Sequence, residues 1–223
     1  SGLTAFILTA TNTFQGNRSM STKYLILIGD GMADYPLAEL DGKTPLEAAN
    51  IPNMDSLAGR GMCGMTINTP QDLPPGSDVA ILSIFGYDPK KYYTGRGPLE
   101  AASKDINLGK DDQVYRCNLV TIEDGLMADY SAGHITTEEA EKLIRALNDN
   151  LGDEYINFYP GVSYRHLLII RKKMEVALST PPHDISGKKI GEYLPKGKNA
   201  DFILDLMERS KKILADHQVN LDR

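Results

Sequence analysis

The stretch "KYLILIGDGM", residues 23–32, is an apolar run that ends in the tripeptide Gly-Asp-Gly. Strands that are apolar along their whole length are typical of parallel sheets, in which both faces are covered. The run therefore predicts a buried strand of an α/β fold. It places Asp30 at the carboxyl end of that strand, where α/β sheets bind their ligands. A turn aspartate between two glycines explains Asp30 equally well at this point.

The residues that follow this strand alternate between helix and strand signals. Thr44 and Glu47 have the spacing of a capping box, with Pro45 at the first helical position. Pro52 can open a second helix, and "MTINT" (65–69) is predicted to be a short strand. Such alternation indicates α/β architecture.

The stretch "PPGSDVAILSIFGYDP", residues 74–89, halts the chain with two prolines and a glycine and then opens a helix at Ser77. Capping the helix is the common role of a serine in this position. A nucleophile is the alternative, because the amide N–H groups at a helix start stabilise a phosphoryl group. No histidine adjoins Ser77 and no GxSxG motif surrounds it. A metal ion held by Asp30 is then the remaining means of activating the serine hydroxyl.

The pattern changes near residue 104, from alternating strand and helix to two strand pairs around one helix. "VYRCNLVTIEDGLMADYSAGHI" (114–135) predicts a hairpin that turns at Asp124-Gly125. "TTEEAEKLIRALNDNLG" (136–152) predicts a capped amphipathic helix, and "EYINFYPGVSYRHLLIIR" (154–171) predicts a second hairpin that turns at Pro160-Gly161. These elements indicate a compact α+β domain inserted at residues 104–180.

The remaining parts of the chain complete the expected organisation. Residues 20–103 are the first part of the main domain, and residues 181–223 return to it. The return segment ends in a helix over residues 199–217, and its predicted buried residues are Ile203, Leu206, Met207, Ile213 and Leu214. Residues 1–19 lack the basic start of a signal peptide, so we interpret them as a leader or non-native extension outside the fold.

Composition limits the class of protein and of partner. A chain of 223 residues with 41% hydrophobic residues is large enough for one or two globular domains. The net charge of -6 gives no broad basic surface for nucleic acid, and no apolar run is long enough to span a bilayer. The two cysteines, Cys63 and Cys117, have no metal-binding or redox spacing, which favours reduced thiols in a cytoplasmic protein.

Several polar residues lie where strands end or turn, and their concentration favours a substrate cleft on one face of the inserted domain. Arg116 and Asn118 are two apart on a strand and so share a face, whereas Arg165 and His166 must lie on opposite faces. The candidate substrate-binding residues are Arg96, Arg116, Asn118, Asp129, His134, Arg165 and His166.

Three long motifs together resemble one known family. "LILIGDGMADYPLAELDGKTPLEAANIPNMDSLA", "PPGSDVAILSIFGYDPKKYYTGRGPLEAAS" and "YRCNLVTIEDGLMADYSAGHIT" resemble the archaeal-type, cofactor-independent phosphoglycerate mutases of the alkaline phosphatase superfamily. The resemblance runs from Met20 to Arg223. It implies a doubly wound alkaline-phosphatase-like sheet interrupted by the inserted α+β domain, a small phosphorylated metabolite as substrate, and metal-dependent transfer through a phosphoserine.

The resemblance also implies the roles of particular residues. Asp30 and Ser77 resemble ligands of a two-metal site, typically manganese, with Mg²⁺, Zn²⁺ or Co²⁺ as alternatives. Ser77 resembles the phospho-accepting nucleophile.

Two departures from the family pattern limit what the resemblance implies. The "DYSAGH" motif (129–134) stands where the mutases carry an arginine-rich motif, and it is similar to a branch proposed to be homoserine kinases. The chain also ends near the family's midpoint, before the remaining aspartate and histidine metal ligands. We therefore expect an incomplete metal site, an inactive chain when alone, and either a homo-oligomer or a missing C-terminal half as its partner.

Overall fold

The computed structural model of the chain describes residues 2–10 and 23–223. These residues divide into two compact units, Ser1–Thr94 and Gly95–Arg223. None of the helices in the described part of the chain is long and apolar enough to cross a membrane.

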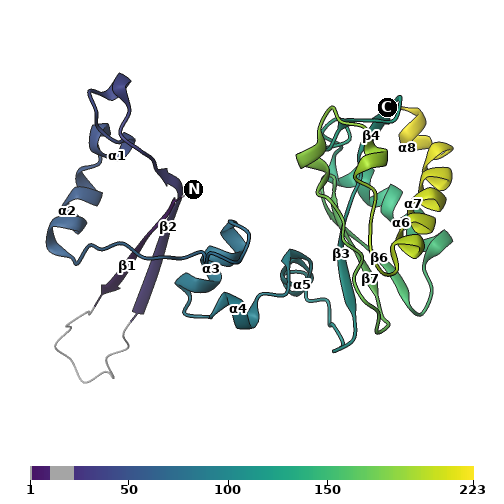
Figure 1. Cartoon of the computed structure of the whole chain (residues 1–223), viewed down its shortest axis with the longest axis horizontal. Helices are drawn as coiled ribbons and strands as arrows, with labels where there is room; N and C mark the ends of the chain where they lie inside the picture. Colours follow the sequence, from purple (N-terminus) through teal and green to yellow (C-terminus); the bar gives the residue numbers. More distant parts are fainter. Residues whose placement is uncertain (1, 11–22) are drawn as a thin grey trace. The chain divides into compact units, whose positions relative to one another are not determined.

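The first unit is built around two antiparallel strands, β1 (Gly2–Ala10) and β2 (Lys23–Ala33), as Figure 1 shows. Their register pairs Phe6 with Leu27 and Leu8 with Leu25. The helices of this unit are η1 (Ala38–Leu40), α1 (Pro45–Ala48), α2 (Pro52–Arg60), α3 (Ser77–Ile84) and α4 (Pro89–Tyr92).

The predicted covering of the apolar strand is not formed among the described residues. The strand itself is present as β2, but it pairs antiparallel in a two-stranded sheet, and Tyr24, Leu25 and Leu27 are 73%, 59% and 54% exposed. All three sheets among the described residues are antiparallel, so a doubly wound parallel sheet is not formed there. The physical reason is long-range: a parallel strand is buried only when neighbouring strands and crossover helices cover both its faces.

Two further expectations for the first unit meet different outcomes. Thr44 Oγ1 accepts a hydrogen bond from the Glu47 amide, and the Glu47 carboxylate accepts one from the Thr44 amide. The predicted capping box is therefore confirmed. The predicted strand at 65–69 is wrong, because this segment pairs with no described strand and leaves Met65 and Ile67 100% and 90% exposed.

The N-terminal segment was expected to lie outside the fold. Gly2–Ala10 instead forms β1, whose partner is β2. Residues 11–19 lie outside the described residues. The interpretation of residues 1–19 as a leader or extension stays a prediction.

The second unit contains a three-stranded antiparallel sheet in the order β3-β7-β6 and a separate hairpin of β4 and β5. The strands are β3 (Gln113–Asn118), β4 (Thr121–Glu123), β5 (Leu126–Asp129), β6 (Ile156–Val162) and β7 (Arg165–Ile170). The hairpin turns at Asp124-Gly125, where both residues have positive φ, 51° and 75°. Two such residues are what a two-residue hairpin turn requires, so this prediction is confirmed.

The second predicted hairpin turns three residues later than expected. β6 continues through Pro160 and Gly161, and the turn lies at Ser163, whose φ is 54°. The register shifts between Tyr159 and Val162, which marks an irregularity of the β-bulge kind. A Cβ on Gly161 would overlap the carbonyl oxygen of Arg165, so the glycine serves close backbone approach within the sheet rather than the turn.

Helices cover both faces of the three-stranded sheet. On one face α6 (Thr137–Leu151) packs against β6 and against α7 (Ala200–Ala215), as Figure 1 shows. α5 (Arg96–Ala102) packs against β3 and β7. The short elements η2 (Pro182–Ile185), η3 (Ile190–Glu192) and α8 (Gln218–Leu221) complete the unit.

The core of this unit follows the predicted helical periodicity. The Thr136–Glu139 capping box is confirmed, and Ala140, Leu143, Ile144 and Leu147 are all buried. The main cluster of buried residues consists of Tyr115, Leu119, Ile135, Ala140, Leu143, Ile144, Leu147, Leu151, Phe158, Leu168, Ile170, Ala177, Ala200, Ile203 and Leu206.

The C-terminal helix departs from the prediction in two ways. Met207 was expected inside but is 46% exposed. α7 also packs on α6 within the second unit, so in this chain residues 181–223 lie with the α+β elements. The predicted domain limits of 104–180 and 181–223 stay predictions about a longer protein.

Candidate active site

Ser77 is the first residue of α3 and is exposed. The extended residue before it, Gly76, is the N-cap, with φ of -161°. The interpretation of Ser77 as N-cap is therefore wrong by one position. The local sequence explains why α3 begins at Ser77, because the preceding Pro74-Pro75-Gly76 does not favour helix.

Asp78 is a neighbour of Ser77 that the sequence did not single out. Its Oδ2 accepts a hydrogen bond from the Tyr93 hydroxyl at 2.5 Å. Its Oδ1 lies so near Gly76 that a Cβ there would overlap it. A carboxylate in the first turn of a helix stabilises the positive end of the helix dipole. Asp78 thus links the start of α3 to the residue after α4.

Arg96 and Arg116 come together in the second unit through a shared carboxylate. Glu100 Oε1 lies 2.9 Å from Arg116 Nε and 3.8 Å from Arg96 Nε. The buried Arg116 Nε forms an ion pair here, although its N–H is not aligned for a hydrogen bond. Helix α5 approaches β3 closely at Gly97, where a Cβ would lie 2.9 Å from the Val114 carbonyl oxygen.

Glu100 was not predicted from the sequence, although its spacing of four residues from Arg96 within a helix was a usable signal. Glu100 cancels one of the two positive charges. The pair of arginines therefore carries a net charge of about +1 toward an anion.

Asn118 and Arg165 are directly opposite each other across β3 and β7. Since Arg116 is two residues from Asn118 on β3, all three side chains share one face of the sheet. Arg165 is exposed, and its guanidinium lies 5.4 Å from the centre of the Tyr164 ring. The structure therefore gathers four of the predicted residues, Arg96, Arg116, Asn118 and Arg165, on the α5 side of the sheet.

His166 lies on the opposite face, as the alternation predicted, and is only 1% exposed. Its Nδ1 accepts a hydrogen bond from the Gly161 amide at 2.9 Å. Burial, and to a lesser degree the positive charge of Lys104, lowers the pKa of His166 to about 4. The ring is therefore neutral, and the structure does not bring it to the face that carries Arg165.

Asp129 organises the "DYSAGH" loop rather than pointing a free carboxylate outward. Its Oδ1 accepts from the Ser131 hydroxyl at 2.6 Å and amide at 2.7 Å, and its Oδ2 accepts from the Gly133 amide at 2.8 Å. These hydrogen bonds lower the pKa of Asp129 below its usual value. The loop holds His134 exposed, with φ of 53°.

The loop is tied to its surroundings at both ends. Arg223 donates to the carbonyl oxygens of Ala132 and Gly133 at 2.7 and 3.0 Å. The Tyr130 ring meets the Tyr164 ring edge-on at 5.8 Å. The loop therefore lies beside the β6–β7 turn and the residue that stacks on Arg165.

A metal site is not complete within the described residues. No group of three or more histidine, cysteine, aspartate or glutamate side chains that could hold a metal ion is found among them. Asp30 belongs to β2, but its side chain lies outside the described part of the structure.

A family model for 2,3-bisphosphoglycerate-independent phosphoglycerate mutase matches residues 58–220. The chain belongs to this family. A mutase of that name from Methanosarcina barkeri is 57% identical over 202 residues, which are 90% of this chain and 51% of the relative. A second from Methanothermobacter thermautotrophicus is 52% identical over 92% of this chain and 51% of its own length. The chain thus spans about half the length of the curated relatives it matches.

Two solved structures are similar to this chain, and one of them is named as a phosphoglycerate mutase. The cofactor-independent phosphoglycerate mutase from Thermoplasma acidophilum is 30% identical, with a TM-score of 0.52 over 86% of this chain and 53% of that one. A protein from Pyrococcus horikoshii is 31% identical, with a TM-score of 0.62 over 87% of this chain and 45% of that one. The names of the mutase relatives do not favour the homoserine kinase alternative that "DYSAGH" had suggested.

Proposed function

We propose that this chain forms part of a phosphoglycerate mutase that interconverts 3-phosphoglycerate and 2-phosphoglycerate in cytoplasmic glycolysis. The observation that carries the proposal is its 57% identity, over 90% of its length, to a relative named as this mutase. In the complete protein, the main domain would adopt an alkaline-phosphatase-like sheet in which β2 is a covered strand. The apolar sequence of β2 supports this, since it suits a strand covered on both faces.

Ser77 is the proposed nucleophile. Its Oγ attacks the phosphorus atom, the bond from phosphorus to the substrate oxygen breaks, and the freed substrate oxygen takes up the proton that the serine loses and becomes a hydroxyl. The phosphoryl group then returns to the other hydroxyl of the glycerate by the reverse step. The position of Ser77 supports this role, because the residue is exposed and begins α3, whose first-turn amides can stabilise phosphoryl oxygens.

The shared face of α5, β3 and β7 is the proposed anchor for the rest of the substrate. Arg116 and Arg165 supply positive charge for the carboxylate and phosphate, and Asn118 supplies an amide between them. Arg96 contributes through the carboxylate that it shares with Arg116. Asp129 positions the loop that presents His134, and His166 positions the β6–β7 turn beside Arg165.

A divalent metal pair, typically manganese, is the proposed activator of the serine hydroxyl. Asp30 and Ser77 are the proposed ligands within this chain. The remaining ligands would come from the half of the relatives' length that this chain does not span. Because the described residues hold no group of three or more ligand side chains, we expect the chain alone not to turn over phosphoglycerate.

The test uses a protein that spans the full length of the relatives. Ser77→Ala should abolish conversion of 3-phosphoglycerate and remove the phosphoserine detected by mass spectrometry. The matched control is Ser179→Ala at another exposed serine, which should leave both unchanged. Turnover by the Ser77→Ala variant would exclude Ser77 as the nucleophile. Phosphorylation of homoserine from ATP, without mutase activity, would exclude phosphoglycerate as the substrate.

A further inference from the structure

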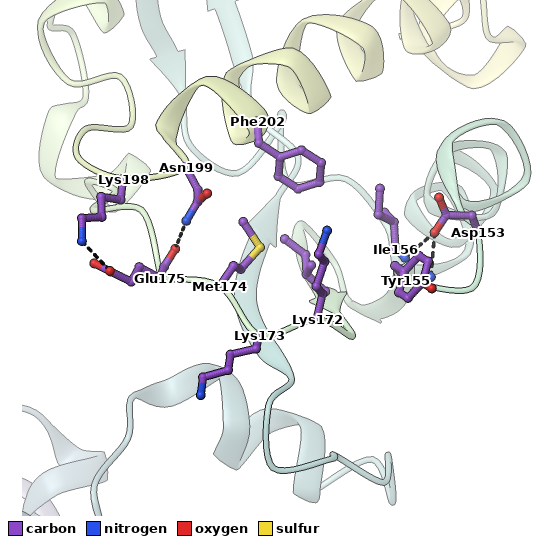
Figure 2. Close-up of a pocket in the computed structure, with 11 residues that line it drawn as sticks. Asp153, Tyr155, Ile156, Lys172, Lys173, Met174, Glu175, Lys198, Asn199 and Phe202 are labelled. Carbon is purple, nitrogen blue, oxygen red and sulfur yellow. Dashed lines mark hydrogen bonds and ion pairs between the residues drawn. The ribbon is translucent and has the colours of Figure 1, made fainter.

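A pocket of about 720 Å³ opens on the second unit, at the end of the sheet where β7 finishes (Figure 2). Three chain segments line it, around residues 153–156, 170–175 and 198–202. Its volume falls within the range of about 300–1,000 Å³ that is usual for small-molecule sites.

The floor of the pocket is apolar and built on regular elements. Ile156 and Ile170 face each other across β6 and β7, and Ile170 is only 2% exposed. Met174 and Phe202 are half-buried and pack against the core of the unit. Figure 2 shows the side chains of Phe202, Met174 and Ile156 around one open space. The floor is therefore formed without a ligand.

Most of the charged groups at the rim already have partners. Lys198 forms an ion pair with Glu175 at 2.5 Å, and Asn199 donates to the Glu175 carbonyl oxygen at 2.8 Å. Asp153 Oδ1 accepts hydrogen bonds from the amides of Tyr155 and Ile156, each at 2.7 Å. These contacts orient both carboxylates toward groups of the protein itself.

Lys172 differs from these residues. Among the described residues its amine has no ion pair and no hydrogen bond, and Figure 2 shows the side chain extending toward Phe202. Lys173 also lines the pocket without such a partner among these residues, but Figure 2 shows its side chain extending away from Phe202. An ammonium beside an apolar floor favours a ligand that supplies both an anionic group and an apolar surface. A bare phosphate would leave the floor unused, and a neutral ligand would leave the amine without a counter-charge.

We propose that this pocket binds a small organic anion whose aromatic or aliphatic body contacts Ile156, Met174 and Phe202 and whose anionic group pairs with Lys172. The site is distinct from the proposed substrate face. Ile170 is five residues along β7 from Arg165, a distance of roughly 17 Å at about 3.4 Å per residue. Ligand binding here needs no turnover, so the proposal stands independently of the mutase proposal.

The test is an NMR titration of the ¹⁵N-labelled 223-residue chain with naphthalene-2-sulfonate. Saturable shifts are expected at the amides of residues 153–156, 172–175 and 198–202. Lys172→Glu should raise the Kd about tenfold, because one charge-assisted contact is lost. Lys142→Glu on the exposed surface of α6 is the matched control, since it changes the net charge equally, and it should leave the Kd unchanged.

A neutral analogue, 2-naphthylmethanol, tests whether binding requires the anionic group. It is titrated into the unaltered chain, so the result does not depend on whether Lys172→Glu folds. It should bind about tenfold more weakly than the sulfonate. Equal affinities for the two compounds would overturn the proposal. So would shifts confined to other segments, or an equal effect of the Lys172 and Lys142 substitutions.

Discussion

Acidification should destabilise the protein through one buried ring, His166. Its folded pKa is lowered from 6.5 to about 4, chiefly by burial, so the unfolded state binds a proton more readily at every pH between these values. Stability is therefore complete above about pH 6.5 and is lost as the pH falls toward 4. At about 1.4 kcal/mol per pKa unit, the total loss is about 3 kcal/mol, of which about 2 kcal/mol is lost by pH 5.

Urea unfolding followed by far-UV circular dichroism between pH 7.5 and 5.0 measures this loss. The two longest helices, α6 and α7, both lie in the second unit and provide most of the signal. His166→Asn keeps an acceptor near the Gly161 amide but cannot be protonated, so its free energy of unfolding should stay nearly constant over this range. His134→Asn, at an exposed histidine, should retain the wild-type pH dependence.

The pH range lies above the unfolded pKa values of the carboxylates whose pKa is lowered, which are about 3.8 for the aspartates and about 4.5 for the glutamates. The lowered pKa of Asp129 contributes stability that is lost only as the pH falls below its unfolded value of about 3.8. If His166→Asn lost as much stability between pH 7.5 and 5.0 as the wild type, the buried neutral ring would not be the cause and the reasoning would be refuted.

Three further predictions concern local features of the second unit and its cysteines. Burial raises the pKa of the Cys117 thiol to about 11, and this cysteine is half-buried, whereas Cys63 is exposed. A disulfide reagent at pH 8 should therefore modify Cys63 quickly and Cys117 much more slowly, and equal rates would contradict the raised pKa. Thr136→Ala removes one half of the α6 capping box and should lower the free energy of unfolding by about 1 kcal/mol. Urea unfolding measures this loss, and an unchanged midpoint would show that the cap is dispensable. Gly161→Ala should lower the free energy of unfolding by about 1–3 kcal/mol, because the new methyl group overlaps the Arg165 carbonyl oxygen. A thermal midpoint equal to that of the wild type would show that the bulge relaxes freely.

Much of the candidate site could be anticipated from short-range sequence signals. The start of α3 at Ser77 follows from the two prolines and the glycine before it, which do not favour helix. The alternation of side chains along a strand placed Arg165 and His166 on opposite faces of the sheet. Glu100 was missed even though its helical spacing from Arg96 was visible. Asp78 was missed because its partner, Tyr93, lies 15 residues away.

The sequence by itself determined the elements whose causes lie within a few residues. These are the capping boxes at Thr44 and Thr136, the apolar stripe of α6 and the turn at Asp124-Gly125. Each depends on hydrogen bonds or side-chain periodicity inside one segment, so no distant residue can alter it much.

Only the tertiary structure decided which segments meet. The apolar run of β2 indicated a covered strand but could not name its partner, and here that partner is β1. Gly161 looked like a turn residue until Arg165 was placed against it, and the pocket at Lys172 is formed by three segments far apart in the sequence. Pairing and burial depend on the whole chain, because a strand or a charge is satisfied by whatever the rest of the fold brings to it.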